Sequence, residues 1–314
     1  MEKKKVSVVI PMYYEEAVAQ ECYHRMTKVL TGMKQYQYEI IFVNDGSRDK
    51  TLEILENIAK QDKNIKIVSF ARNFGHQCAV TAGLKEVTGD AVVIIDADLQ
   101  DPPELIPDML ALWEKGNEVI YGKRKTRQGE SAFKLFTAKM FYKTLNALSD
   151  VEIPKDTGDF RLVDRKVVDT INAMPEHNKF LRGLFSWVGY QQIPFEYERQ
   201  KRFAGETKYP LKKMLKLAGD GIIGFSSKPL KIVGGLGIFS ILVSFFILVY
   251  TLISFAFKWN YLTPGWTSIM VTMTFLGGII LISLWMIGEY IARIYDETKN
   301  RPQYIVDRKI NIDQ

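Results

Sequence analysis

Two long stretches without a charged residue constrain the fold of this chain more than any other feature. The first, Ile232 to Phe257, has 26 residues, and the second, Trp266 to Gly288, has 23. A helix needs about 20 apolar residues to cross the hydrocarbon core of a bilayer. A helix of a soluble domain seldom reaches this length without a charge, because one of its faces normally meets water. The sequence therefore predicts two transmembrane helices joined by a short turn.

Basic residues are unevenly distributed around these stretches. Nine basic and only two acidic residues lie between Arg199 and Lys231, so this belt accounts for the net charge of +6. More basic residues follow the second stretch, whereas the connecting turn has only Lys258. Because loops rich in Lys and Arg stay in the cytoplasm, we expect a multi-pass protein of the cell membrane with its N-terminal domain and both termini in the cytoplasm. The place of the belt, before a membrane helix, favours contact with membrane lipids over nucleic acid.

Short apolar runs alternate with helical patterns through the first 125 residues. The predicted strands are Val6–Ile10, Glu39–Val43, Ile65–Phe70, Ala91–Ile95 and Glu118–Tyr121, and the predicted helices are Glu15–Leu30, Lys50–Lys60, His76–Val87 and Glu104–Lys115. This alternation is typical of an α/β domain with a mainly parallel sheet and helices on both of its faces. Such sheets bind ligands at the carboxyl ends of their strands, so the residues that follow each strand are candidates for a site.

The remaining residues complete a predicted division of the chain. A helix is predicted at Phe133–Leu148, and a loop that enters a strand at Gly158–Val163. The expected parts are an α/β domain at 1–205, a basic amphipathic segment on the membrane surface at 206–231, transmembrane helices at 232–257 and 266–288, an extracytoplasmic turn at 258–265, and a cytoplasmic tail at 289–314. The small residues Ser240 and Ser244 leave open a homo-oligomer formed through these helices.

The segment that follows the fourth predicted strand carries four carboxylates in nine residues. Asp96 ends the strand and Asp98 follows two residues later. Carboxylates this close repel each other unless a cation lies between them, and Mg²⁺ or Mn²⁺ takes oxygen ligands while keeping positions for phosphate oxygens. We therefore expect Asp96 and Asp98 to serve a metal and a diphosphate. Asp101 and Glu104, with prolines between them, fit a capping box, so we expect them to cap the next helix.

A second polar group, Asn44 to Asp49, follows the second predicted strand. Its turn amides and the helix after it suit the ribose or phosphate oxygens of a nucleotide, and we expect Asp45 and Ser47 to take part. A plain turn in which Ser47 or Asp49 caps the helix explains the same residues. The two interpretations do not exclude each other.

Six motifs occur in a fixed order along the chain. They are Val9-Ile-Pro-Met-Tyr-Tyr-Glu-Glu16, Val43-Asn-Asp-Gly-Ser47, Arg72-Asn-Phe-Gly75, Asp96-Ala-Asp-Leu-Gln-Asp-Pro-Pro-Glu104, Thr157-Gly-Asp-Phe-Arg-Leu162 and Arg182-Gly-Leu184. The ordered set resembles the family 2 glycosyltransferases of GT-A fold. More narrowly, it resembles the bacterial polyprenyl-phosphate glycosyltransferases, often called bactoprenol glucosyltransferases, which are related to dolichol-phosphate mannose synthase. The resemblance extends over nearly the whole chain and implies a Rossmann-like sheet followed by amphipathic interface helices and two transmembrane helices.

The resemblance also implies roles for the matching residues. The nucleotide pocket would be lined by Pro11, Tyr13, Glu15, Asp45, Arg72 and Asp96. Mg²⁺ or Mn²⁺ would be held by Asp96, Asp98 and Gln100. Asp159 matches the catalytic carboxylate, which would act together with Asp98. The lipid phosphate and the diphosphate would be met by Arg124, Lys134, Arg182, Arg202 and Lys208. Lys134 stands where relatives can carry Arg, so a bidentate contact is lost there.

The activity that the resemblance implies is an inverting transfer of one sugar from a nucleotide sugar to undecaprenyl phosphate, giving a lipid-linked sugar for modification of cell-envelope glycans. We expect UDP-glucose as the donor, with UDP-N-acetylglucosamine as the second choice. The second pKa of a phosphate monoester is about 6, so the acceptor is largely dianionic near neutral pH. Asp159 is therefore not required as a strong base, and would instead orient a substrate or stabilise positive charge at the anomeric carbon.

Three other functions share part of this pattern. A processive polysaccharide synthase has the same domain, but it carries a Gln-x-x-Arg-Trp motif and usually more membrane helices than are predicted here. An aspartyl-phosphate phosphatase uses Asp-x-Asp after its first strand, with Thr or Val two residues later, where this chain has Gln100 after the fourth strand. A membrane scaffold without activity would not need Asp96, Asp98 and Asp159 together.

Overall fold

The computed structural model describes residues 3–125, 154, 157–177, 179–200, 228–257 and 265–312. These residues belong to two compact units. The first extends to residue 221 and also includes the C-terminal residues from Pro302, and the second spans Ile222–Arg301. The predicted helix Phe133–Leu148 and most of the predicted amphipathic segment, up to residue 227, lie outside the described residues.

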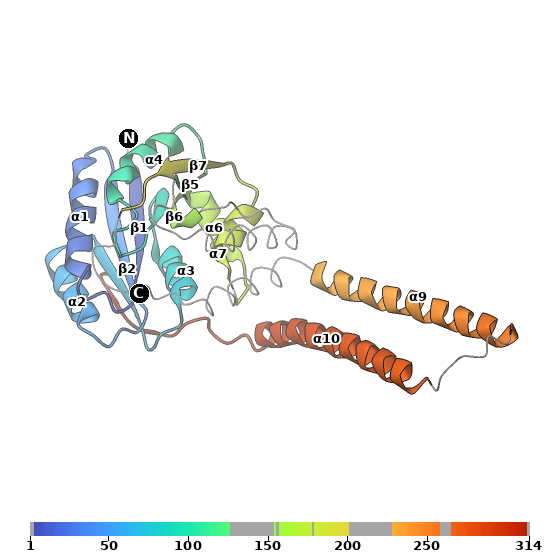
Figure 1. Ribbon diagram of the computed structural model, residues 1–314. Coiled ribbons are helices and arrows are strands. Elements are labelled where there is room, and N and C mark those ends of the chain that lie inside the picture. Colours follow the sequence, from blue (N-terminus) through green and yellow to red (C-terminus); the bar gives the residue numbers. More distant parts are fainter. Residues whose placement is uncertain are drawn as a thin grey trace. The chain divides into compact units, whose positions relative to one another are not determined.

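The first unit is built on an eight-stranded mixed sheet with the order β7-β5-β6-β4-β1-β2-β3-β8 (Figure 1). The strands are β1 Lys5–Met12, β2 Gln37–Asn44, β3 Ile65–Phe70, β4 Ala91–Ile94, β5 Val119–Arg124, β6 Thr157–Asp164, β7 Gln192–Tyr197 and β8 Val306–Ile310. Strands β3, β2, β1 and β4 are parallel, as predicted. Strand β6 runs antiparallel to β4 and β5, and β8 runs antiparallel to β3. The parallel centre of the predicted α/β fold is therefore confirmed, within a sheet that is mixed at its sides.

Helices cover both faces of this sheet. They are α1 Ala19–Gly32, α2 Thr51–Gln61, α3 His76–Glu86, the short 3-10 helix η1 Pro103–Leu105, α4 Ile106–Trp113, α6 Arg165–Ala173 and α7 Leu181–Trp187. Successive side chains of a strand point to opposite faces. Val8 of β1 belongs to the core that α1, α2 and α4 complete, whereas Val9 faces α3, where a Cβ on Gly83 would lie 2.3 Å from its Cγ1. Both faces of β1 are thus buried, which explains its unbroken apolar sequence.

The segment after β4 does not form the predicted capping box. Neither η1 nor α4 has a side-chain cap, and α4 begins only at Ile106. Asp101 has no exposed surface and accepts a hydrogen bond from the Tyr197 hydroxyl, 96 residues away. Glu104 accepts bonds from Arg25 of α1 at 2.7 to 3.1 Å. The prediction was wrong because both carboxylates find partners that are distant in sequence.

The C-terminal residues, predicted to be a cytoplasmic tail, include a strand of the sheet. Strand β8 pairs with β3 and covers what would otherwise be the edge of the sheet. An exposed strand edge offers unpaired backbone groups to other chains, so this pairing protects it. Arg308 and Lys309 of β8 add ion pairs with Glu56 at 3.0 Å and Glu86 at 2.7 Å.

The second unit contains two long helices, α9 Lys228–Ala256 and α10 Trp266–Thr298, which contact each other. Within the described residues, the stretch Phe275–Thr298 is long and apolar enough to cross a membrane, and Leu230–Ser240 is a shorter apolar helix. Large apolar side chains are exposed on both helices, for example Phe246 at 68% and Leu281 at 69%. The part of the chain that the structure describes therefore contains one candidate span, where the sequence predicted two.

Candidate active site

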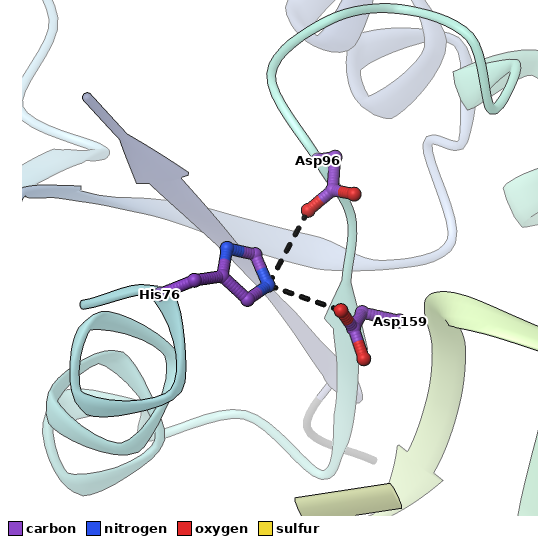
Figure 2. Close-up of side chains that lie close together, drawn as sticks. All are labelled: His76, Asp96 and Asp159. Atoms are coloured by element: carbon purple, nitrogen blue, oxygen red, sulfur yellow. Dashed lines mark hydrogen bonds and ion pairs between the residues drawn. The ribbon is translucent and has the colours of Figure 1, made fainter. Parts of the chain in front are cut away.

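Three ionisable side chains from different elements meet beyond the carboxyl end of β4. His76 is the first residue of α3, Asp96 follows β4, and Asp159 lies in β6. Figure 2 shows the imidazole of His76 directed between the two carboxylates. Its Nε2 lies 3.1 Å from Asp159 Oδ2 and 3.6 Å from Asp96 Oδ1. One potential ligand atom from each residue falls within 4.8 Å of the others.

Asp159 is also held by Arg182 of α7. The guanidinium donates from Nε to Oδ1 at 2.8 Å and from Nη2 to Oδ2 at 3.0 Å. Such two-point pairs fix the orientation of both groups. Burial alone would raise the pKa of Asp159, but Arg182 and His76 hold it well below its ordinary value. Asp159 is therefore a carboxylate that stays ionised and accepts protons poorly.

Negative charge is crowded around Asp96. Burial raises the pKa of Asp96 to about 6, with help from the carboxylates of Asp159, Asp101 and Asp98 and against the effect of His76. Burial lowers the pKa of His76, but Asp96 and Asp159 raise it to about 9. Carboxylate oxygens are the ligands that a hard divalent cation prefers, so Asp96 and the neighbouring Asp98 fit one, whereas the raised pKa of His76 keeps its imidazole protonated and without a lone pair for a metal.

The loop that contains Asp98 and Gln100 has a constrained backbone. Asp98 is 8% exposed and its Oδ1 accepts a bond from the Gln100 amide at 3.1 Å. Leu99 between them has a φ of 56°, a conformation that non-glycine residues seldom adopt. The Gln100 side-chain amide lies 3.5 Å from the Gln200 carbonyl. The predicted metal ligand Gln100 thus has its amide nitrogen directed to the segment after β7.

Helix α3 also sets the position of α7. The Gln77 side chain accepts a hydrogen bond at 3.0 Å from the backbone nitrogen of Leu181, at the start of α7. The first amides of a helix have no partner within the helix, so this bond satisfies one of them. Because Arg182 is the next residue, Gln77 fixes the part of α7 that reaches Asp159.

Asp45, predicted to bind the nucleotide, bonds the neighbouring loop instead of standing free. Its carboxylate accepts from the amides of Phe74 at 2.7 Å and Gly75 at 2.9 Å, and from Asn73 Nδ2 at 2.7 Å. Burial raises the pKa of Asp45, and the two amides oppose that rise. Asp45 therefore holds together the loops that follow β2 and β3.

The other residues predicted for the nucleotide lie at the carboxyl ends of β1, β2 and β3. Pro11 is in β1, and Tyr13 is 36% exposed just after it. The Glu15 amide donates to Thr51 Oγ1 at 2.9 Å, and Ser47 Oγ accepts from the amide of Tyr14 at 3.0 Å. Ser47 therefore joins the loops after β1 and β2, while Asp49 Oδ1 accepts a bond at 3.1 Å from the amide of Thr51, the first residue of α2. The Arg72 guanidinium lies 4.1 Å from the centre of the Phe74 ring.

A second buried polar cluster adjoins the site. The Tyr197 hydroxyl bonds both Asp101 and Arg124. Arg199 lies 3.7 Å from Asp101. A Cβ on Gly158 would lie 2.8 Å from Arg124 Nη2, so Arg124 runs close beside the strand that carries Asp159. The predicted phosphate-binding residues Lys134, Arg202 and Lys208 lie outside the described residues.

Two residues of the site, His76 and Gln77, were not predicted. His76 meets Asp159 from 83 residues away, so no short spacing in the sequence joins the two. The sequence nevertheless indicates their position, because His76 and Gln77 directly follow Gly75, in the segment after the third predicted strand. Ligands bind at the carboxyl ends of parallel strands, and this rule, which identified Asp96, also applies to His76 and Gln77.

Comparisons with known proteins identify the relatives of this chain. A family model described as "Glycosyl transferase family 2" matches residues 7–171. An uncharacterized glycosyltransferase of Bacillus subtilis, YkcC, is 50% identical over 98% of this chain and 94% of its own length. The prophage bactoprenol glucosyl transferase homolog of Escherichia coli K12 is 40% identical over 97% of this chain and 99% of its own length. The bactoprenol glucosyl transferase of Shigella phage SfX is 41% identical over 96% and 98%.

Solved structures align more loosely. Glucosyl-3-phosphoglycerate synthase from Mycobacterium tuberculosis, in complex with Mn²⁺, UDP-glucose and phosphoglyceric acid, is 20% identical over 70% of this chain and 78% of that chain, with a TM-score of 0.47. A score this low assigns no ligand or residue to the present chain.

Proposed function

The chain belongs to glycosyltransferase family 2, and from this premise we propose that it transfers a single sugar from a nucleotide sugar to a polyprenyl phosphate. The observation that carries this proposal is the alignment with the bactoprenol glucosyl transferases, which extends over 97% of the chain. It therefore includes α9 and α10 as well as the sheet and its site. A shared catalytic domain alone would leave the acceptor open, whereas shared membrane helices favour an acceptor that lies in a bilayer.

In this proposal, both α9 and α10 cross the membrane. Phe275–Thr298 of α10 meets the length and composition of a span. Helix α9 contains the 25 uncharged residues from Ile232 to Ala256, and its Phe245 side chain is 57% exposed. The basic residues on the flanks favour a cytoplasmic site. A polyprenyl tail would lie in the same bilayer, with its phosphate at the cytoplasmic surface.

Asp96 and Asp98 are proposed to hold Mg²⁺ or Mn²⁺, next to His76. The crowded carboxylates around Asp96 support this assignment. When bound, such an ion neutralises the diphosphate of the nucleotide. The loops that carry Tyr13, Asp45 and Arg72 would hold the rest of the donor at the same rim of the sheet.

In the proposed reaction, a phosphate oxygen of the lipid forms a bond to the anomeric carbon of the sugar. The bond from that carbon to the diphosphate oxygen breaks, and the nucleoside diphosphate leaves with the electron pair. The configuration inverts, so an α-linked donor gives a β-linked glycosyl phosphate. No proton needs to be removed from a dianionic acceptor. Asp159, bound by Arg182 and His76, is accordingly proposed to position these two cations at the reacting phosphates rather than to act as a base.

Glucose is the sugar that we propose first, since the bactoprenol relatives are named as glucosyl transferases. UDP-glucose is therefore the first donor to examine and UDP-N-acetylglucosamine the second. The product would be a polyprenyl-linked monosaccharide for modification of envelope glycans.

The test uses the purified full-length protein in detergent with undecaprenyl phosphate, Mg²⁺ or Mn²⁺, and a panel of labelled nucleotide sugars. One donor should give a lipid product with a single added sugar by mass spectrometry, and undecaprenol without phosphate should give none. Failure to label the lipid with any donor would falsify the acceptor assignment. A product with several sugars would identify a processive synthase instead.

A further inference from the structure

The C-terminal segment reaches the loop after β3 through a series of aromatic contacts. We propose that Tyr304 is a positioning residue for the loop Ala71–Gly75, acting through Phe70 and Phe74. The proposal rests on the function given above, in which Arg72 of this loop lines the nucleotide pocket. It adds the residues that follow α10 to the structure that binds the donor.

The first contact joins Tyr304 to β3. Its ring stacks on that of Phe70, with 4.8 Å between centroids and 18° between planes. Phe70 is 3% exposed and is the last residue of β3, so its ring is a fixed support at the start of the loop. Lys85 of α3 lies 5.5 Å from the Tyr304 ring. Tyr304 is therefore held between the strand before the loop and the helix after it.

The second and third contacts carry this support to Arg72. The Phe70 ring meets the Phe74 ring edge to face, with 5.7 Å between centroids. Arg72 lies over the Phe74 ring at 4.1 Å. The amide of Phe74 is bonded to Asp45 at 2.7 Å. The orientation of the Phe74 ring thus depends on Phe70 on one side and determines the place of the Arg72 guanidinium on the other.

Backbone bonds tie the same segment to the loop independently of the Tyr304 side chain. The Ala71 amide donates to the Ile305 carbonyl at 3.0 Å. Beyond it, β8 pairs with β3, and Asn311 Nδ2 donates to the carbonyls of Ala59 and Ile65 at 2.8 Å. Removing the Tyr304 ring should therefore leave the segment attached, and the effect of the stack can be measured alone.

The segment is also the direct continuation of a candidate membrane helix. Tyr304 follows Thr298, the last residue of α10, by six positions. The chain therefore passes from the apolar helix to the support of the donor loop within a few residues.

The experiment compares Tyr304→Ala with Tyr304→Phe, which keeps the stack, and with Ile305→Ala. Ile305 is the matched control because it is adjacent, 55% exposed and bonded through its backbone only. Hydrogen exchange of the full-length protein in detergent is followed in the peptide covering Phe70–Gln77. Steady-state kinetics then give KM for the nucleotide sugar and kcat.

Tyr304→Ala should speed exchange in this peptide and raise KM for the donor about 10-fold, with kcat within about twofold. Tyr304→Phe and Ile305→Ala should match the wild type in both measurements. Wild-type exchange and KM in Tyr304→Ala overturn the proposal, as does faster exchange throughout the sheet, which indicates a loss of stability only. The exchange measurement needs no substrate, so it decides the structural claim even if no lipid product is found in the transfer assay.

Discussion

Arg182 of α7 holds Asp159 through two parallel hydrogen bonds, and His76 of α3 lies 3.1 Å from an oxygen of the same carboxylate. Replacing Arg182 by Lys keeps the charge but loses the two-point contact. We expect Arg182→Lys to lower kcat about 100-fold, the usual scale for loss of one preorganised donor. Steady-state kinetics measure this, with Arg165→Lys as the control because the Arg165 guanidinium bonds Asp169 and the Val87 carbonyl and not Asp159. Equal activity of the two variants would remove Arg182 from the site.

Asp98→Asn tests the metal assignment. The amide keeps the shape of the side chain but loses the charge that a divalent cation requires. The rate at saturating Mg²⁺ or Mn²⁺ should fall about 100-fold, and the concentration of metal for half-maximal rate should rise. Asp108→Asn, an exposed change on α4, is the control. A chelator should stop turnover of the wild type, and metal-stimulated turnover of Asp98→Asn at the original rate contradicts the assignment.

Replacement of Gln77 should have a smaller and indirect effect on catalysis. Gln77→Ala leaves the Leu181 amide without its acceptor, so α7 and Arg182 lose part of their support. We expect kcat to fall about 10-fold, because small displacements of positioned groups are costly. Gln77→Glu keeps an acceptor oxygen and should retain most of the activity. In a double variant with Arg182→Lys, the two losses should not add, since both act on one contact. Full additivity would show that Gln77 acts elsewhere.

The stability of the sheet should depend on pH through Glu39. This carboxylate is 1% exposed and is bonded by Lys5 at 2.7 Å and Lys66 at 2.8 Å. Burial would raise the pKa of Glu39, but the bonds from Lys5, Lys66, Ser7 and Thr88 lower it to about 2. A pKa that is depressed in the folded state gives stability that is fully present above the unfolded value and is lost as the pH falls toward the folded value.

Glu39→Gln removes this contribution. The shift corresponds to about 3 kcal/mol in the free energy of unfolding at neutral pH. Thermal unfolding in detergent should show the variant well below the wild type at pH 7, with the gap closing as the pH falls from about 4.5 toward 2. Glu196→Gln, at an exposed pair with Lys123, should show no such gap. A gap of constant size at all pH values would assign the loss to packing rather than to charge.

The centre of the sheet was predictable because parallel strands covered on both faces have continuous apolar sequences. Ile65–Phe70 was predicted with both ends correct. Strands β7 and β8 were not predicted, since each lies at an edge of the sheet and lacks a continuous apolar sequence. Strand β8, near the C-terminus, pairs with β3, which lies in the first quarter of the sequence. No local pattern can show such a pairing.

The same limit applies to the site. Asp96, Asp159 and Arg182 were expected from motifs that each follow or begin an element, and they do lie close together. Asp101 was assigned to a helix cap by its local sequence, yet it is buried against Tyr197. His76 was passed over because no short spacing marks it. Local patterns thus identified residues at strand ends, while pairings over long distances needed the fold.

Gly46 imposes a limit on how this site can evolve. It has a φ of 67°, and a Cβ there would lie 2.3 Å from the backbone carbon of Arg72 and 2.6 Å from the amide of Asn73. Backbone atoms cannot move aside as a flexible side chain can, so saturation mutagenesis should recover only glycine at this codon. The distance between the loops after β2 and β3 is therefore fixed at this point, and variants of the protein cannot widen the site by separating them here.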